Sequence, residues 1–461
     1  MASQTQPRGV GWRSKPSFVI VTVAFGLFTD LVLYGIVVPV LPFLLRDRFL
    51  VPDEQLQPYT SGLLAVYSAS SVLFPLPAGW SASRVGSRRL FLAGLALLCA
   101  SSAAFAFAGS FTILLSSRLL QGMSTAIVWT AGLDMVQDTV PPGQIGEAIG
   151  TIFATISAGE LVAPMAGGVI YEWAGTHGIF GISAALLVVD FAMRLLVVDS
   201  KTAIKYGAGD ANDANDANHD GDDGDDGDQD QERYKIRGDV VGIFKTLPIL
   251  HCFREPRLHV AMTLSLVQAL LIGALDATVP IEAESLFGFS SLQVGLIFTA
   301  LMTPYLALGR LAGQAVDRYG TRTVTTLGYL YLAPCLVLLG LPGQHVVSGK
   351  YNNISLFCLA LAMNGVGLAA VSSPAFVEAI DIVGKYESAN PELFGVNGPY
   401  AQLFGFNSMY FFAGLGIGPI LAGALRSQFG FLNMGVAFAA MSAMTSVASF
   451  FMVGPRRGDC H

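Results

Sequence analysis

The sequence predicts an all-helical membrane protein with twelve transmembrane helices, arranged as two six-helix halves around a central cavity. Three observations support this fold class. Hydrophobic residues make up 53% of the 461 positions and charged residues only 13%, whereas soluble domains carry roughly 25% charged residues. Apolar stretches of about 20 residues, long enough to cross a bilayer, recur along the chain. Finally, two motifs of the first half return in the second half.

The internal repeat is visible in two pairs of motifs. GELVAPMAGG contains Pro164 and GLGIGPILAG contains Pro419, so the two prolines are 419 − 164 = 255 residues apart. GWSASRVGSRR begins at Gly79 and GQAVDRYGTR begins at Gly313, which is 313 − 79 = 234 residues later. Parallel repeats of this kind are typical of transporters whose halves move around a shared site.

Twelve apolar stretches are candidate membrane spans. The fourth and fifth are weak by hydropathy, as expected for helices that line a cavity and show only one face to lipid. The predicted spans lie near residues 18–45, 60–81, 90–109, 112–136, 146–171, 178–198, 258–283, 292–316, 323–341, 354–383, 399–426 and 431–454.

Positive charges indicate how the chain is oriented. Lys and Arg residues precede the first span, follow the second, eighth and twelfth, and fill the connection between the sixth and seventh. By the positive-inside rule these segments face the cytosol. The expected organisation is a cytosolic tail (1–17), a first bundle (18–198), a cytosolic linker (199–257), a second bundle (258–454) and a cytosolic tail (455–461). The host membrane is expected to be the plasma membrane or a vacuolar or vesicular membrane.

The composition also excludes several function classes. The linker run DANDANDANHDGDDGDDGDQDQER is too acidic and polar to form a core and is expected to be disordered. It holds no complete EF-hand loop, and the five cysteines form no zinc spacing, so no metal site is predicted. The ATP-binding signature GxxxxGK[ST] is absent. No catalytic set supports an enzyme, no cofactor is expected, and no basic stripe suggests nucleic acid. The expected partners are a small-molecule substrate, protons and the lipid bilayer, and the chain is expected to be a monomer.

Ionisable residues inside predicted spans are functional candidates, because burying a charge in a bilayer is unfavourable. Asp30, in FTDLVLYGIVVPVLP, should bind a cation or a proton; the alternative is a structural carboxylate hydrogen-bonded to a neighbouring helix. Asp276, in span seven, is a candidate for substrate binding, with a structural role equally open. Glu282 and Glu284 lie near the outer end of that span and are expected to be solvated.

Span ten carries two acids, Glu378 and Asp381, in SSPAFVEAIDIV. They are three residues apart and therefore share one helical face. Two nearby carboxylates in a poorly solvated site should not both ionise freely, so one of them should retain a proton, as a proton carrier must. The alternative is that both lie near the cytosolic end of the helix and are simply solvated.

Span four offers Arg118, Gln121 and Asp134. Arg118 stays charged, so if buried it needs a partner or an anionic ligand; a structural ion pair and a gating role are both open. Gln121 and Asp134 are candidates for substrate contacts. Glu160, within the first proline–glycine motif, has small neighbours that suggest close helix packing, and its role is left open.

The motif that begins at Gly79 is expected to form the loop between two helices. Gly79 should allow close helix approach and Gly86 a tight turn, while the arginines can cap helix ends or pair with acids. The second copy has Asp317 where the first has Ser83, so a stronger charge network is expected in the second half. The residues expected to act in conformational change are Gly79, Arg84, Gly86 and Arg88 in the first copy and Gly313, Asp317, Arg318 and Gly320 in the second.

These motifs resemble those of the major facilitator superfamily over essentially the full length, apart from the tail and the acidic linker. GWSASRVGSRR and GQAVDRYGTR are similar to its loop signature G-x-x-x-D-R-x-G-R-R, from which Ser83 departs. RLLQG resembles its fourth-helix motif, which implies a role in proton coupling for Arg118. The antiporter motif G-x8-G-x3-G-P-x2-G-G is resembled by Gly150, Gly159, Pro164, Gly167 and Gly168, with Ala163 in place of one glycine, and Gly418 and Pro419 stand in its second copy.

Within that superfamily the chain is similar to the vesicular amine transporters and their fungal relatives. DLVLYGIVVPVLP, SAGELVAPMAGGVIYEWAG and PAFVEAID carry this resemblance. It implies that Asp30 recognises a cationic substrate and that Asp381 takes part in proton coupling or substrate binding. Asn407 stands near the place of that family's eleventh-helix aspartate, which is missing here, and it is a candidate for substrate contact. The resemblance implies proton-driven export of a drug, amine or metabolite by alternating access. Import of a nutrient on the same fold, and a non-transporting receptor or scaffold, are the alternatives.

Overall fold

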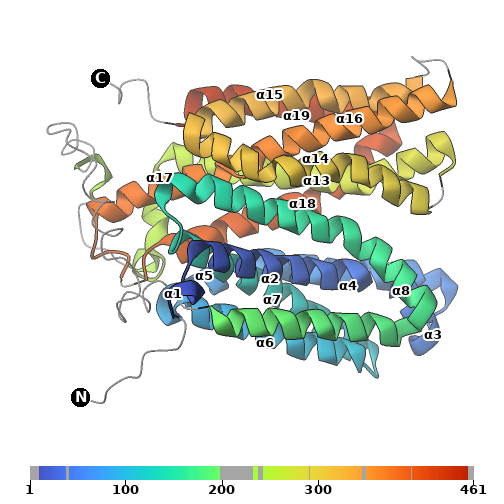
Figure 1. The fold of residues 1–461 in the computed structure, drawn as a ribbon, viewed down its shortest axis with the longest axis horizontal. Coiled ribbons are helices and arrows are strands. Elements are labelled where there is room, and N and C mark those ends of the chain that lie inside the picture. The colour runs from blue at the N-terminus through green and yellow to red at the C-terminus, as the bar shows by residue number, and fades with distance from the viewer. Residues whose placement is uncertain are drawn as a thin grey trace.

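The computed structural model describes residues 10–37, 41–197, 232–236, 242–289, 291–344, 349–395 and 397–454. Every regular element in these ranges is helical. Figure 1 shows two bundles side by side, with α2, α4, α6 and α7 in one and α13 to α16 in the other. The helices run roughly parallel to one long axis, as expected for spans that cross a membrane together.

The first bundle follows the predicted spans closely, with two informative breaks. Pro75 begins α5 after Phe74, and the helical stretches on either side of this junction are bent by 44°. Gly175, with a φ of 61°, interrupts α8, so the chain turns back there and forms the fifth and sixth spans (Figure 1). The elements are α1 (Val10–Arg13), α2 (Pro16–Val37), α3 (Leu41–Phe49), α4 (Asp53–Leu73), α5 (Pro75–Val85), α6 (Ser87–Ala106), α7 (Phe111–Gln137), η2 (Pro142–Gln144) and α8 (Ile145–Leu196).

The second bundle repeats this order after a short approach segment. Its elements are α12 (Ile243–Thr246), η3 (Pro248–Arg254), α13 (Pro256–Phe287), α14 (Ser291–Tyr319), α15 (Thr321–Gly340), η4 (Leu341–Gln344), α16 (Lys350–Val371), α17 (Pro374–Ala389), α18 (Tyr400–Phe429) and α19 (Phe431–Met452).

Two predicted spans each cover two helices. The first, predicted over 18–45, covers α2 and the start of α3, and residues 38–40 between them lie outside the described residues. The tenth, predicted over 354–383, contains a helix break, because α16 ends at Val371 and Pro374 starts α17, although the two together are long enough for a single span. Proline is favoured at the first position of a helix, where its missing N–H is not needed. The break places both acids predicted for span ten on α17.

The number of spans agrees with the twelve-helix fold. Ten helical segments of the described chain are long and apolar enough to cross a membrane, and the bent pair formed by α4 and α5 makes an eleventh. The part of α8 before Gly175 completes the twelve.

The sequence repeat corresponds to a repeated helix contact. In the first half α8 packs on α2 so closely that a Cβ on Gly167 would lie 2.5 Å from the carbonyl oxygen of Ile36. In the second half α18 packs on α13, and a Cβ on Gly418 would lie 2.3 Å from the carbonyl oxygen of Leu270. Small residues are required wherever two helix backbones approach this closely. Each copy of the proline–glycine motif therefore joins the first and fifth helices of its half.

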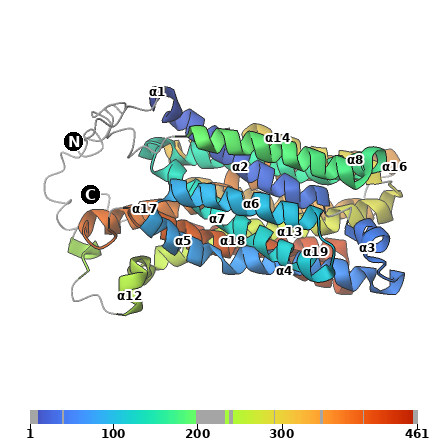
Figure 2. The same ribbon diagram turned by 90° about the horizontal axis from the view of Figure 1, so that it is seen from below.

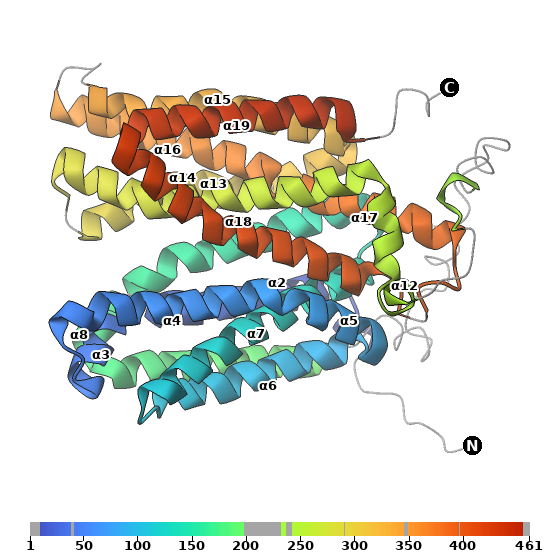
Figure 3. The ribbon, with the colours of Figure 1, turned by 180° about the vertical axis from the view of Figure 1, so that it is seen from behind.

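One end of the molecule carries the connections of the chain and is called the linker end below. It includes the α5–α6 turn, η2, η3 and the start of α18. Figures 2 and 3 place α12 and α17 at this end, and Figure 2 places α1 there as well. The opposite end, where α8 turns back at Gly175, is called the far end.

Candidate functional site

Asp30 is the centre of a buried polar group inside the first bundle. It is 2% exposed, and the Thr125 hydroxyl of α7 donates to its Oδ1 over 3.0 Å. The Tyr67 hydroxyl of α4 lies 2.9 Å from that of Thr125, and the rings of Tyr67 and Tyr34 stack with centroids 4.4 Å apart. Helix α4 can come this close to α7 because a Cβ on Gly122 would lie 2.3 Å from the Tyr67 carbonyl oxygen. The other carboxylate oxygen, Oδ2, has no partner among the described residues.

Arg118 is a fully buried cation on the far side of the same tyrosines. Its guanidinium donates to Gln121 Oε1 over 3.1 Å and lies over the Phe105 ring at 4.6 Å. Gln121 in turn donates to the Ser102 hydroxyl over 3.4 Å. The guanidinium interacts electrostatically with Tyr34, while its Nε and one terminal nitrogen have no hydrogen-bond partner in the described chain. The guanidinium group therefore has N–H groups available to donate to a further acceptor.

Two other candidates lie away from Asp30. Asp134 is close to the linker end of α7 and accepts a hydrogen bond from the Ser87 hydroxyl at the start of α6. Asn407 lies between α18 and α13, where its Oδ1 accepts from Ser265. This hydrogen bond therefore joins α13 to α18 within the second bundle. The structure does not bring these two residues together with Asp30, and their predicted substrate contacts stay predictions.

A second polar group lies between the two halves. Glu160 of α8 and Asp276 of α13 are partly exposed, and their charges interact. Asp276 lines a small pocket together with Ser157 of α8 and Tyr305 of α14. The Tyr305 hydroxyl faces Ser157 and Gln268 but makes no hydrogen bond of normal length within the described residues. The sequence identified both acids, but it could not show that the fold brings their charges within interacting range.

An aromatic layer separates this central region from the linker end. Trp129 of α7 lies 5.3 Å from Phe411 and 5.1 Å from Phe412 of α18, measured between ring centroids. Phe153 of α8 lies 5.5 Å from Phe411 and 5.2 Å from Phe376 of α17. All five side chains are buried. Because the layer draws rings from both halves, it closes the interface between them to water.

The two acids predicted for span ten lie at the linker end beside a basic residue. Glu378 Oε1 accepts from Arg257 over 3.0 and 2.6 Å, and Oε2 accepts from Thr321 over 2.5 Å. Asp381 has a side chain that is 48% exposed and lies 3.7 Å from Arg257 and 3.5 Å from Lys385. They are therefore not an uncompensated acid pair, because Arg257 neutralises them. Their part in proton coupling stays a prediction.

Two further ion pairs, one buried and one partly exposed, were missed from the sequence. Asp190 and Arg194 form a fully buried pair in the second part of α8, 2.6 Å apart, with the guanidinium over the Phe91 ring at 3.9 Å. An acid and an arginine four residues apart in an apolar span were the available signal. The second pair joins Glu282 to Arg426 at 2.9 Å. The expectation that Glu282 is solvated is therefore wrong, because α18 brings a guanidinium to it.

The two copies of the loop motif join the halves at the linker end. Asp317 of α14 accepts the backbone N–H groups of Gly146 and Glu147, each over 2.8 Å, and so caps the start of α8. In the first copy, the Ser83 hydroxyl of α5 accepts from Gln402 of α18 over 3.2 Å. A carboxylate at a helix N-terminus is stabilised by the helix dipole, whereas the serine contact is neutral.

Glycines allow the halves to meet backbone to backbone at these joints. A Cβ on Gly150 would lie 2.2 Å from the carbonyl oxygen of Gly309, and one on Gly313 would lie 2.0 Å from that of Gly146. At the other joint a Cβ on Gly79 would lie 2.5 Å from a carbonyl oxygen of α18. Any side chain here would separate the halves. The structure is therefore closed at the linker end.

The remaining loop-motif residues lie in equivalent positions. Gly86 and Gly320, with φ of 93° and 82°, precede the helices that follow each copy of the motif. Such backbone conformations favour glycine. Arg84 and Arg318 lie over aromatic rings of their own helices, and Arg88 lies in the first turn of α6.

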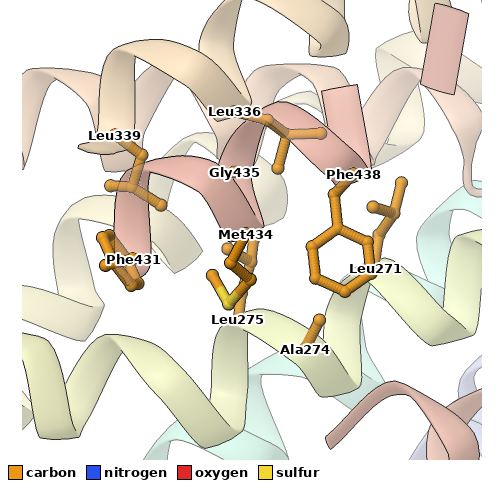
Figure 4. Close-up of a pocket in the computed structure, with 9 residues that line it drawn as sticks. All are labelled: Leu271, Ala274, Leu275, Leu336, Leu339, Phe431, Met434, Gly435 and Phe438. Atoms are coloured by element: carbon orange, nitrogen blue, oxygen red, sulfur yellow. The ribbon is translucent and has the colours of Figure 1, made fainter. Parts of the chain in front are cut away.

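A further pocket lies inside the second bundle, between α13, α15 and α19 (Figure 4). Leu271, Met434 and Phe438 are among its lining residues, all of which are apolar. It offers no polar side chain for recognising a charged or hydrogen-bonding ligand. The polar chemistry is concentrated at Asp30, at Arg118 and between the halves.

Comparison with known proteins agrees with this architecture. The chain is 56% identical to the MFS-type transporter ppzB of Metarhizium rileyi over an alignment that covers 98% of each chain. It is 23% identical to the vesicular acetylcholine transporter of Drosophila melanogaster, over 91% of this chain and 69% of that one. The solved structure of the proton:xylose symporter XylE has the same fold, with a TM-score of 0.69, 13% identity and coverage of 94% and 95%.

The sequence model described as Major Facilitator Superfamily matches residues 23–290 and 261–459, which together span nearly the whole chain. Two bundles related by a repeat, with polar groups between them, are typical of secondary transporters. The protein belongs to the major facilitator superfamily and is a multi-pass membrane protein that acts as a secondary transporter of small molecules.

Proposed function

We propose that this transporter exports small organic molecules, cations foremost among them, in exchange for protons. The observation that carries the proposal is Asp30, a carboxylate buried in the first bundle with one oxygen unpartnered in the described chain. A carboxylate buried away from water is more stable when a proton or a bound cation neutralises its charge. Proton and substrate can therefore compete for Asp30, which is the basis of an exchange cycle.

The positive charges of the linker end support its assignment to the cytosol. Lys and Arg are frequent in the linker and in the loops at that end. In the present state the aromatic layer and the two glycine joints close this end. For export, the joints open, substrate enters from the cytosol and displaces the proton from Asp30. The halves then rock, and a proton from the outer side displaces the substrate.

The exchange is obligatory for an electrostatic reason. An ionised Asp30 without a counter-charge would have to stay in a poorly hydrated interior while the cavity is occluded. Occlusion is therefore favourable only when the carboxylate carries a proton or a cation. The Tyr34–Tyr67 stack beside it presents aromatic faces, to which organic cations are attracted.

Transport in proteoliposomes tests the proposal. We would reconstitute the full chain, impose an acidic interior and measure uptake of tetraphenylphosphonium and rhodamine 6G with and without a protonophore. Gradient-driven uptake that the protonophore abolishes, and that Asp30→Asn lacks, is the expected result. Glu284→Gln is the matched control, because it removes an exposed carboxylate at the far end of α13. Uptake that ignores the imposed pH gradient would refute proton exchange.

A further inference from the structure

We propose that Glu160 and Asp276 form a second proton site, distinct from Asp30, which holds one proton between the two halves. This inference rests on the proposed proton exchange. It adds a location at which protonation acts directly on the relative position of the halves. Asp30 cannot do this by itself, because its contacts with the described residues all lie within the first bundle.

The position of the two acids is the first argument. Glu160 belongs to α8 of the first half and Asp276 to α13 of the second, and their charges interact across the interface. Neither carboxylate makes a hydrogen bond or ion pair within the part of the chain that the structure describes. Two ionised carboxylates that lie within electrostatic range of each other and have no counter-ion repel, and one proton on the pair removes that repulsion.

Unsatisfied polar groups beside the pair are the second argument. The Tyr305 hydroxyl and both polar atoms of the Gln268 amide are buried and have no hydrogen-bond partner among the described residues. Tyr305 lines the same pocket as Asp276 and interacts with Glu160. Buried polar groups are rarely left unpaired in native proteins. The other lining residues of that pocket, Ser157 apart, are apolar, so the pocket offers a charged Asp276 few polar partners.

Among the described residues, no cationic side chain interacts with either acid of the pair. Tyr34 of α2 and Tyr305 of α14 interact with Glu160, and Ser157 lies one turn before it on α8. Arg118 interacts with Tyr34 but not with either carboxylate in the described structure. A proton is therefore the available neutralising charge when no substrate is bound.

The same tyrosines connect the two acid sites. Tyr34 interacts with Glu160 and stacks on Tyr67, whose hydroxyl contacts Thr125, the donor to Asp30. Because repulsion between Glu160 and Asp276 acts across the interface, loss of their proton favours separation of the halves at this level. Gain of the proton favours their approach. The pair thus converts proton occupancy into a bias on the alternating-access equilibrium.

The test compares exchange that needs no proton movement with transport that does. In proteoliposomes we would measure tetraphenylphosphonium counterflow at equal pH on both sides, and accumulation driven by a pH gradient. Glu160→Gln should retain counterflow and lose at least tenfold in gradient-driven accumulation, and Asp276→Asn should lose accumulation to the same extent. The double variant should be no worse than either single variant, because the two groups act as a unit. Glu284→Gln should behave as wild type.

Other outcomes overturn the inference in distinguishable ways. Additive losses would show two independent acids, and an unchanged pH profile of accumulation would show that the pair carries no proton. A raised KM for tetraphenylphosphonium with coupling intact would assign the pair to substrate binding instead. If the single variants also lose counterflow, the double variant Glu160→Asp with Asp276→Glu tests the inference, because it keeps both carboxyl groups. Retained coupling to the pH gradient in this variant supports the pair, and lost coupling refutes it. Wild-type transport that ignores the gradient would refute the proposed function itself, and this inference with it.

Discussion

Replacing Asp317 by alanine should shift the transporter toward the state that is open at the linker end. The carboxylate accepts two backbone hydrogen bonds of 2.8 Å from the start of α8, across the boundary between the halves. Losing a helix cap costs about 0.5–2 kcal/mol, and losing a negative charge at a helix N-terminus costs about 0.3–1 kcal/mol. These contacts exist only while the joint is closed, so the loss of about 1–3 kcal/mol changes the open-to-closed ratio by about 5–150-fold.

Hydrogen exchange measured by mass spectrometry can detect this change in the open-to-closed ratio at a site distant from the mutation. If the halves move as rigid bodies, both joints open together, so amides at the start of α18 should exchange about 5–150-fold faster in Asp317→Ala. The matched control is Ser83→Ala, which removes a neutral hydrogen bond at the other joint. Its effect should be smaller, about 0.5–1.5 kcal/mol. Faster exchange confined to the first turn of α8 would refute the coupling of the two joints.

Three further substitutions probe packing and buried charge. Glu378→Gln breaks the buried pair with Arg257 and should lower the free energy of unfolding by about 3–5 kcal/mol in denaturant titrations in detergent; unchanged stability would contradict a structural role. Arg194→Met leaves Asp190 buried without its cation and should destabilise by a similar amount. Adding Asp190→Asn should recover part of that loss, and no recovery would contradict the pairing. Gly150→Val places a side chain against the α14 backbone and should reduce counterflow at least tenfold at normal expression; normal counterflow would show that the joint need not close.

Hydropathy predicted the helices well, because a span must be apolar over about 20 residues whatever it packs against. Helix breaks were harder. Pro75 and Pro374 begin new helices, whereas Pro280 and Pro304 lie inside continuous ones. A proline in a transmembrane helix is tolerated when neighbouring groups satisfy the freed carbonyl. That condition depends on other helices, so local sequence cannot decide it.

The acids of the candidate site were also found from the sequence, since any carboxylate inside an apolar span stands out. Their partners were not. Arg257 was counted among the positive charges of the linker, yet it binds Glu378, which is 121 residues away. The role of Glu160 was left open, and only the tertiary structure brings its charge within range of Asp276. Which charges compensate each other depends on how the helices pack. The pairs therefore cannot be identified before the tertiary structure is known.

The glycine crossing of α8 and α14 has a consequence for how such a transporter can be adjusted. Where Gly150 meets Gly309, the two helices touch through their backbones, so no long side chain has to be withdrawn when the halves part at this point. The resting preference for one orientation then depends on a few polar contacts at the rim of the joint, such as that of Asp317. Single substitutions at the rim can therefore retune the cycle while both helical bundles keep their interiors unchanged.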